Sequence, residues 1–243
     1  MNKTLYTQCR ALYDLAFPGE PEAFTAALFD RYFPEHLRVI CEGERPVSML
    51  FSIPCPVQTE SGTLPARYIY AVATHPDYRG KGFAKQLLAA EAEKYPIFLR
   101  PMSPSLFDFY AKAGFSPVSP ILQHSGEATV AGGRERKLTP AAYLALRQEF
   151  APLPCTVPTV EFLSLYEPGG GFVAYGLDAV ALYEKHGDKI WFKEYWGDTL
   201  FAPRLAAFLG GTHFELRTVD PDGTPFGVGI GVPADTAFLA AMD

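Results

Sequence analysis

The spacing of apolar residues predicts two helices followed by strands in the first part of the chain. Over residues 4–17 the apolar positions recur every three or four residues, as on one face of a helix, and Pro18-Gly19 ends the pattern. A second helix is expected between Pro21 and Pro34. Strands rich in β-branched and aromatic residues are expected over residues 37–41, 47–53 and 67–74, the first two joined as a hairpin.

A glycine-containing turn separates the last of these strands from a further helix. Helices are expected over residues 83–95 and 105–113, with Gly114 as the C-cap of the second. Strands are expected over residues 97–99 and 115–123. The expected order along the chain is two helices, then antiparallel strands, then alternating strands and helices. This order indicates an α/β (α+β) layer with the glycine turn in its middle.

The second half of the chain repeats this order of elements. A helix capped by Thr139 runs to about residue 150, and another is expected over residues 199–209. Strands are expected over residues 172–175, 179–184, 189–195, 214–219 and 226–232. We interpret the repeat as a degenerate internal duplication and expect domains over residues 1–125 and 137–243, with a polar linker at 126–136.

Composition narrows the class of protein. Of 243 residues, 48% are hydrophobic and 20% are charged, which is typical of a globular protein. The net charge of −6 lies entirely in residues 126–243, which argues against nucleic-acid binding and is compatible with a cationic substrate. The four cysteines lack disulfide or metal-site spacing, and there is no signal peptide or long apolar run. We therefore expect a cytoplasmic protein with no bound metal and no membrane contact.

The turn after residue 74 carries the most informative chemistry of the chain. It reads Arg79-Gly80-Lys81-Gly82-Phe83-Ala84, and an amphipathic helix begins within it. The first N–H groups of a helix have no intrahelical partner and carry partial positive charge. Glycines let a ligand approach that backbone closely, so the turn predicts a site for phosphate groups.

A second motif lies about 30 residues further on and reads Phe109-Tyr110-Ala111-Lys112-Ala113-Gly114-Phe115. Together the two motifs, in this order and on these elements, make residues 4–123 resemble the GNAT superfamily of acyl-CoA-dependent N-acetyltransferases. The resemblance implies a mixed, mostly antiparallel sheet with helices on both faces. The second half is more loosely similar to the partial, cofactor-free GNAT-like domain of tandem GNAT proteins.

The resemblance also implies acetyl-CoA as the co-substrate and assigns residues to it. The backbone of Val72, Ala73 and Thr74 would pair with the pantetheine arm like an added strand. Lys85 would add a charged contact to phosphate. The N–H groups that would hold the pyrophosphate belong to Arg79, Gly80, Lys81, Gly82, Phe83 and Ala84.

Tyr110 is the candidate proton donor, because a tyrosine at this place in the superfamily often protonates the leaving CoA thiolate. The expected strand carboxylate is missing, since residues 66–71 contain no Asp or Glu. Three sources of a general base stay open. Glu42 could act through water, the amine could arrive neutral, or the carboxylates of the chain end at Asp243 could serve.

The resemblance therefore implies direct acetyl transfer to a primary amine, and we favour a small molecule, an aminosugar or a polyamine as the acceptor. A protein or peptide acceptor is one alternative. Another is a non-catalytic acyl-CoA-binding or regulatory module, which the missing strand carboxylate favours and Tyr110 disfavours. The sequence leaves open the acceptor, the length of the acyl group and whether the chain forms a homodimer.

Overall fold

The computed structural model describes residues 3–239, which form two compact units. The first unit contains residues 3–56, 64–116 and 228–232, and the second contains residues 57–63, 117–227 and 233–239. The units therefore exchange segments, and neither is one continuous stretch of chain. The division into domains over residues 1–125 and 137–243 with a linker at 126–136 stays a prediction, and the compact units have different bounds.

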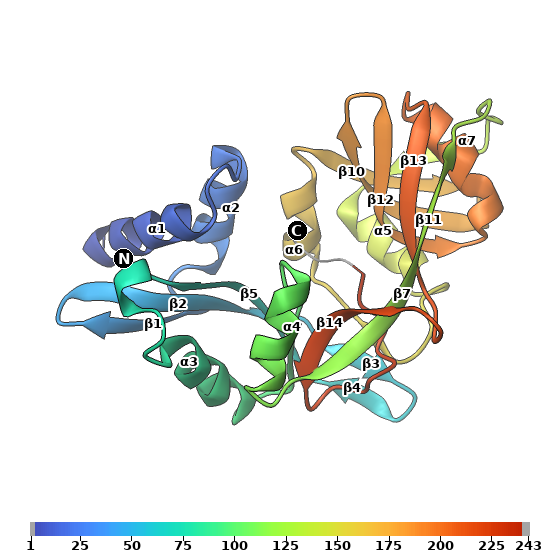
Figure 1. Cartoon of the computed structure of the whole chain (residues 1–243). Coiled ribbons are helices and arrows are strands. Elements are labelled where there is room, and N and C mark those ends of the chain that lie inside the picture. The colour runs from blue at the N-terminus through green and yellow to red at the C-terminus, as the bar shows by residue number, and fades with distance from the viewer. Residues whose placement is uncertain (1–2, 240–243) are drawn as a thin grey trace. The chain divides into compact units, whose positions relative to one another are not determined.

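The first unit is a five-stranded sheet with helices on both faces. Its helices are α1 (Lys3–Ala16), α2 (Glu22–Tyr32), the 3₁₀ turn η1 (Pro76–Tyr78), α3 (Phe83–Ala92) and α4 (Pro104–Ala111). Its strands, in sheet order, are β1 (Leu37–Glu42), β2 (Arg45–Pro54), β5 (Arg67–Thr74), β6 (Ile97–Leu99) and β14 (Thr224–Ile230). Figure 1 shows α1 and α2 on one face of β1, β2 and β5 and α3 on the other. The helix and strand signals read from the sequence are confirmed here, with ends shifted by a few residues.

Only one short stretch of this sheet is parallel. Strands β5 and β6 pair in parallel at Arg67↔Ile97 and Tyr68↔Phe98 and no further, and the connection between them passes through α3. Strand β14 pairs with the other edge of β6, antiparallel, from Val228↔Leu99 to Ile230↔Ile97. A segment more than a hundred residues downstream therefore completes the sheet of the first unit.

The second unit contains a six-stranded sheet and a smaller three-stranded one. The large sheet, in order, is β7 (Ser116–Glu127), β13 (His213–Val219), β12 (Lys189–Gly197), β11 (Ala179–His186), β10 (Gly170–Tyr175) and β8 (Glu135–Leu138). The small sheet is β4 (Gly62–Leu64), β3 (Val57–Thr59) and β9 (Cys155–Thr156). The helices are α5 (Pro140–Arg147), α6 (Val160–Leu163), η2 (Ser164–Tyr166), η3 (Thr199–Phe201) and α7 (Ala202–Phe208).

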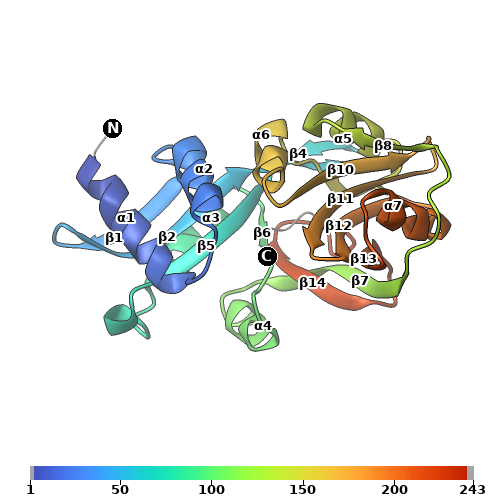
Figure 2. The same cartoon turned by 90° about the horizontal axis from the view of Figure 1, so that it is seen from above.

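Helices α5 and α7 cover opposite faces of the large sheet (Figure 2). Neighbouring residues of β10 point to opposite faces, and Val173 joins the cluster around α7 while Phe172 packs on Tyr143 of α5. Under α5 the Arg147 guanidinium makes two hydrogen bonds of 2.9 Å to the Glu194 carboxylate, and both side chains are fully buried. The α5 face thus carries a paired charge inside an otherwise apolar core.

Part of the second unit repeats an order of strands and helices that is found in the first unit. An antiparallel meander, β10, β11 and β12, is followed by η3, α7 and the parallel strand β13. In the first unit β1, β2 and β5 are followed in the same way by α3 and parallel β6. Among the helices of residues 3–239, none has the length and apolar character that crossing a membrane requires.

The dependence of the first unit on β14 is testable at Val228, which is 2% exposed and packs in the cluster that contains Leu99, Leu88 and Tyr110. We expect Val228→Asp to lower the free energy of unfolding by about 3 kcal/mol, because it buries an unpaired carboxylate. Urea denaturation followed by circular dichroism measures the change.

The matched control for Val228→Asp is Leu177→Asp, at a leucine that is 72% exposed. We expect the control to change the free energy by less than about 0.5 kcal/mol. A Val228→Asp protein as stable as the wild type would contradict the assignment of β14 to the first core.

Candidate functional site

A β-bulge interrupts β5 in the middle of the first unit. Met49 of β2 pairs with Ala73, and Phe51 pairs with Tyr70, so two residues of β5 face the single residue between them. Ala71 has a φ of +53°, which is uncommon for a residue other than glycine. Bulges bend a strand and redirect its backbone groups, and here the bend lies just beyond the point where β5 and β6 part.

The end of β5 therefore presents backbone groups that no neighbouring strand pairs. The N–H of His75 donates to the Val47 carbonyl at 2.8 Å, on the β2 side. Successive residues of a strand direct their backbone N–H and C=O groups to opposite edges of the strand. The N–H and C=O groups of Thr74 therefore point to the other edge of β5, where β6 does not pair with it. Arg79 Nε donates to the Thr74 carbonyl at 3.3 Å there. An extended ligand can pair along this edge as an additional strand.

The chain turns sharply after β5. His75 Nδ1 accepts a hydrogen bond of 3.4 Å from the Asp77 N–H, and His75 Nε2 lies 2.7 Å from the Arg45 guanidinium. Gly80 and Gly82 follow with φ of +78° and +82°, a region that side chains with a Cβ disfavour. A Cβ would meet no atom within 4 Å at either glycine. Backbone conformation, and not crowding, is what requires glycine here.

Helix α3 begins at the end of this turn. Gly82 is its N-cap and offers no side chain to the first N–H groups. The first backbone bond of the helix runs from Gln86 N to the Gly82 carbonyl, at 3.0 Å. The N–H groups of residues 83–85 come before this first bond, and the helix offers them no carbonyl acceptor. Lys81 and Lys85 stand beside this helix start, with Lys81 Nζ 4.5 Å from the centre of the Tyr78 ring. The start of α3 is therefore suited to an anion.

A cavity of about 540 Å³ joins the open strand edge to the helix start. Nine of the ten residues predicted to bind CoA line it, all but Lys81, and so does Tyr110. Their contacts with CoA remain a prediction. Six further lining residues were not predicted from the sequence: Ala16, Phe17, Tyr78, Met102, Leu106 and Phe109. Phe109 stood inside the quoted motif, whereas the approach of Phe17 depends on the packing of α1 and has no local signal.

Tyr110 lies on α4 and is 6% exposed. Its ring packs edge-on against Phe109 and Phe115, with centroids 5.1 Å and 5.4 Å apart. Burial raises the pKa of the Tyr110 phenol to about 12. The phenol therefore keeps its proton throughout the neutral range and can act as a donor into the cavity.

Among residues 3–239, those that line the cavity include no carboxylate and no imidazole. Glu42 is exposed at the end of β1, and the cavity is lined by no residue of that strand. Asp243, the other candidate for a general base, lies outside the described residues. The cavity thus combines a glycine turn at a helix start, an open strand edge and a buried tyrosine, and the described residues that line it include no carboxylate or imidazole.

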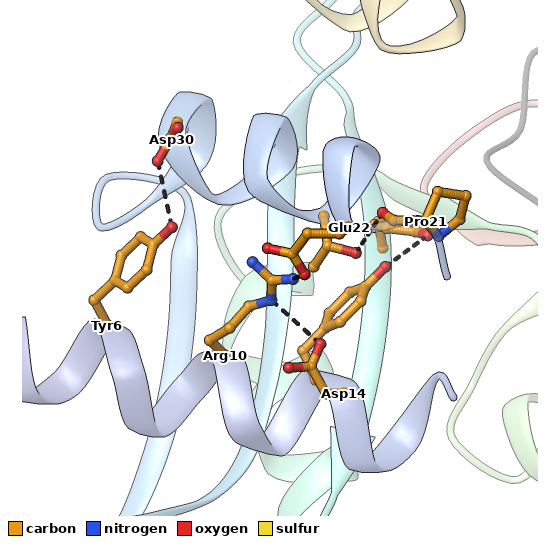
Figure 3. A network of polar contacts seen from close by, with 9 residues as sticks. Tyr6, Arg10, Asp14, Pro21, Glu22 and Asp30 are labelled. Atoms are coloured by element: carbon orange, nitrogen blue, oxygen red, sulfur yellow. Dashed lines mark hydrogen bonds and ion pairs between the residues drawn. The ribbon is translucent and has the colours of Figure 1, made fainter. Parts of the chain in front are cut away.

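Polar contacts on the outer side of α1 connect it to α2, next to the wall of the cavity that α1 provides (Figure 3). Tyr6 donates to Asp30 at 3.3 Å, and Arg10 bridges Asp14 and Glu22 at 3.2 Å and 2.5 Å. These contacts hold the two helices side by side, so the end of α1 keeps its place. Ala16 and Phe17 at that end reach the cavity.

Comparison with known proteins agrees with this arrangement. Residues 1–118 match the family model described as "Acetyltransferase (GNAT) domain". No curated protein matches the sequence.

Three solved structures are similar to the chain over most of its length. A probable N-acyltransferase from Enterococcus faecalis V583 has 17% identity and a TM-score of 0.70, covering 94% of this chain and 70% of that one. A GCN5-related N-acetyltransferase from Kribbella flavida has 15% identity and a TM-score of 0.68, with coverages of 91% and 63%. Eis1 from Mycobacterium abscessus has 11% identity and a TM-score of 0.62, with coverages of 93% and 65%. The chain has the GNAT fold and spans less than two thirds of the length of the last two proteins.

The glycine at the start of α3 provides a test of the anion site. We expect Gly82→Ala to weaken CoA binding about tenfold, because an L-residue at this φ costs roughly 1–2 kcal/mol and distorts the helix start. Isothermal titration with CoA measures the dissociation constant.

Gly169→Ala is the matched control, since Gly169 is exposed, has no positive φ and would also place its Cβ in open space. We expect CoA binding of that variant to equal the wild type. Equal binding by Gly82→Ala would show that this turn is not the phosphate site.

Proposed function

We propose that this protein is an acyl-CoA-dependent N-acetyltransferase that moves an acetyl group directly from acetyl-CoA to the primary amine of a small molecule. One observation carries the proposal: the same cavity holds a glycine turn at a helix start, an open strand edge and a buried tyrosine. The turn suits a pyrophosphate, the edge suits the amides of a pantetheine arm, and the tyrosine suits a departing thiolate.

In the proposed reaction the two substrates meet at the bulge of β5. The amine nitrogen attacks the thioester carbon, a C–N bond forms, and the C–S bond breaks as the electron pair moves to sulfur. The N–H of Val72 stabilises the oxygen that gains charge, and the Tyr110 hydroxyl gives its proton to the sulfur. The amine loses one proton, so the proton count balances when that proton reaches Tyr110 through solvent. Holding both substrates in one complex supplies much of the acceleration.

The proton acceptor is proposed to be the carboxylate group at Asp243. Support comes from the cavity lining, which lacks a carboxylate, and from the chain just before this residue. Ser119 Oγ donates to the Phe238 carbonyl at 2.8 Å and accepts from the Phe238 N–H at 3.1 Å. Phe238 and Leu239 are buried in the second unit. The chain is thus anchored up to four residues before Asp243.

We further propose that the second unit is a degenerate GNAT-like copy without a cofactor site. Its meander, helix and parallel strand follow the order of the first unit. At the matching junction Gly197 has a φ of +99°, but Asp198 follows it and caps η3 by accepting from the Leu200 N–H at 2.9 Å. A carboxylate therefore occupies the helix start that a phosphate would need, and its charge would repel one.

A non-catalytic acyl-CoA-binding module is the second candidate function, because the cavity lining lacks a base. Release of free CoA thiol from acetyl-CoA in the presence of single amines separates the two. The panel contains polyamines, aminosugars and lysine peptides. We expect at least one small amine to give turnover, and binding of acetyl-CoA without turnover across the panel would favour the binding module.

The role of Tyr110 is tested in the same assay. We expect Tyr110→Phe to lower kcat at least about tenfold while CoA affinity stays within about twofold, because only the proton donor is lost. Since burial raises the Tyr110 pKa to about 12, wild-type turnover should not fall between about pH 7 and about pH 10 through loss of this proton.

Tyr78→Phe is the matched control, because Tyr78 lines the phosphate end of the same cavity. Its kcat is expected to stay close to the wild-type value. Full activity of Tyr110→Phe would remove this residue from the mechanism.

The proposed acceptor of the amine proton has its own test. We expect deletion of residues 241–243 to lower turnover at neutral pH at least about tenfold, with a smaller loss at a pH where the amine is largely neutral. Thermal unfolding and CoA titration check that the fold and the donor site are intact. Retained activity in a folded variant would exclude Asp243 and leave Glu42 acting through water or an amine that arrives neutral.

A further inference from the structure

Phe17, the residue that follows α1, forms part of the cavity wall together with Ala16. Its N–H continues the helix pattern by donating to the Tyr13 carbonyl at 2.9 Å. The inference drawn from this residue rests on the proposed function, because it concerns the acyl group of the donor.

The direction of β5 indicates at which end of the cavity Phe17 lies. The phosphate turn follows the end of this strand, whereas Tyr70 lies four residues before Thr74, about 13 Å back along the strand. The Phe17 ring is stacked on the Tyr70 ring, with centroids 6.5 Å apart and an angle of 16° between the planes. Phe17 therefore lies at the end of the cavity opposite the phosphates.

Phe17 is braced and cannot withdraw easily. The Tyr13 ring packs against it at 4.9 Å, and the Tyr13 and Tyr70 hydroxyls are joined by a hydrogen bond of 3.3 Å. Tyr13 is fully buried, Tyr70 is 9% exposed, and Phe24 packs edge-on against Tyr70 at 6.4 Å. Phe17 itself is half-buried, and turning it away from the cavity would break its packing on the buried Tyr13 and Tyr70 rings.

The thioester of a bound donor lies between these two ends. Its carbonyl is expected at the bulge beside Val72, near Tyr110, and the pantetheine arm leads from there to the phosphates. The acyl carbons beyond the carbonyl must therefore extend in the other direction, toward Phe17. We propose that Phe17 closes this end of the cavity and restricts the donor to short acyl groups such as acetyl.

The test compares acetyl-CoA with hexanoyl-CoA in the wild type and in Phe17→Ala. Dissociation constants from isothermal titration provide a readout that does not depend on turnover. We expect the wild type to bind hexanoyl-CoA at least about tenfold more weakly than acetyl-CoA, because the longer chain collides with the braced ring. In Phe17→Ala this preference should fall at least about tenfold.

Phe109→Ala is the matched control, since it removes the same side chain from the α4 wall of the cavity. It should alter the affinity of both donors by the same factor and leave their ratio unchanged. Phe17→Leu, which keeps an apolar side chain of intermediate size, should give an intermediate ratio and serves if Phe17→Ala does not fold.

Two results would overturn the inference: equal binding of both donors by the wild type, or an unchanged ratio in the folded Phe17 variants. Failure of the proposed function gives a different result, namely no thiol release by the wild type with any amine. The donor preference can then still be measured by titration, so the two failures are distinguishable.

Discussion

The separation of β5 from β6 is the constraint on which the rest of the site depends. The two strands pair at two positions only, and the bulge at Ala71 then turns the end of β5 away from its neighbour. Backbone groups inside a sheet are normally paired, so an open edge in the middle of a sheet is available to an extended ligand. The glycine turn, α3 and Tyr110 are all arranged around this opening.

The two units use the same kind of strand-to-helix junction in opposite ways. In the first unit Gly82 leaves the start of α3 without a side-chain cap, so its N–H groups face the cavity. In the second unit the Asp198 carboxylate accepts a hydrogen bond from the Leu200 N–H at the start of η3. A helix start that is already capped by a carboxylate has little left to offer a phosphate. The two junctions therefore differ in whether a side chain of the chain itself occupies the helix start.

On the α1 side the cavity is lined by Ala16 and the Phe17 ring, and further rings that do not line the cavity pack behind Phe17. Tyr13, Phe17 and Tyr70 pack together, and the phenols of Tyr13 and Tyr70 are hydrogen-bonded. Burial keeps the Tyr110 phenol protonated on the α4 side. The lining of the cavity thus includes backbone and cationic side chains at the glycine turn and aromatic, uncharged side chains from α4 and the end of α1.

The sequence by itself determined the local features of this protein, because helix periods, strand alternation, caps and glycine turns depend on neighbours in the chain. It located α1, α2, the meander, the glycine turn and the Tyr110 motif, and it noted that β5 lacks a carboxylate. Only the tertiary structure decided that β14 joins β6, that residues 57–63 belong to the second unit and that Phe17 reaches the cavity. Each of these depends on pairing or packing between residues that are distant in sequence. The free energy of such contacts comes from burial and register, which no local pattern encodes.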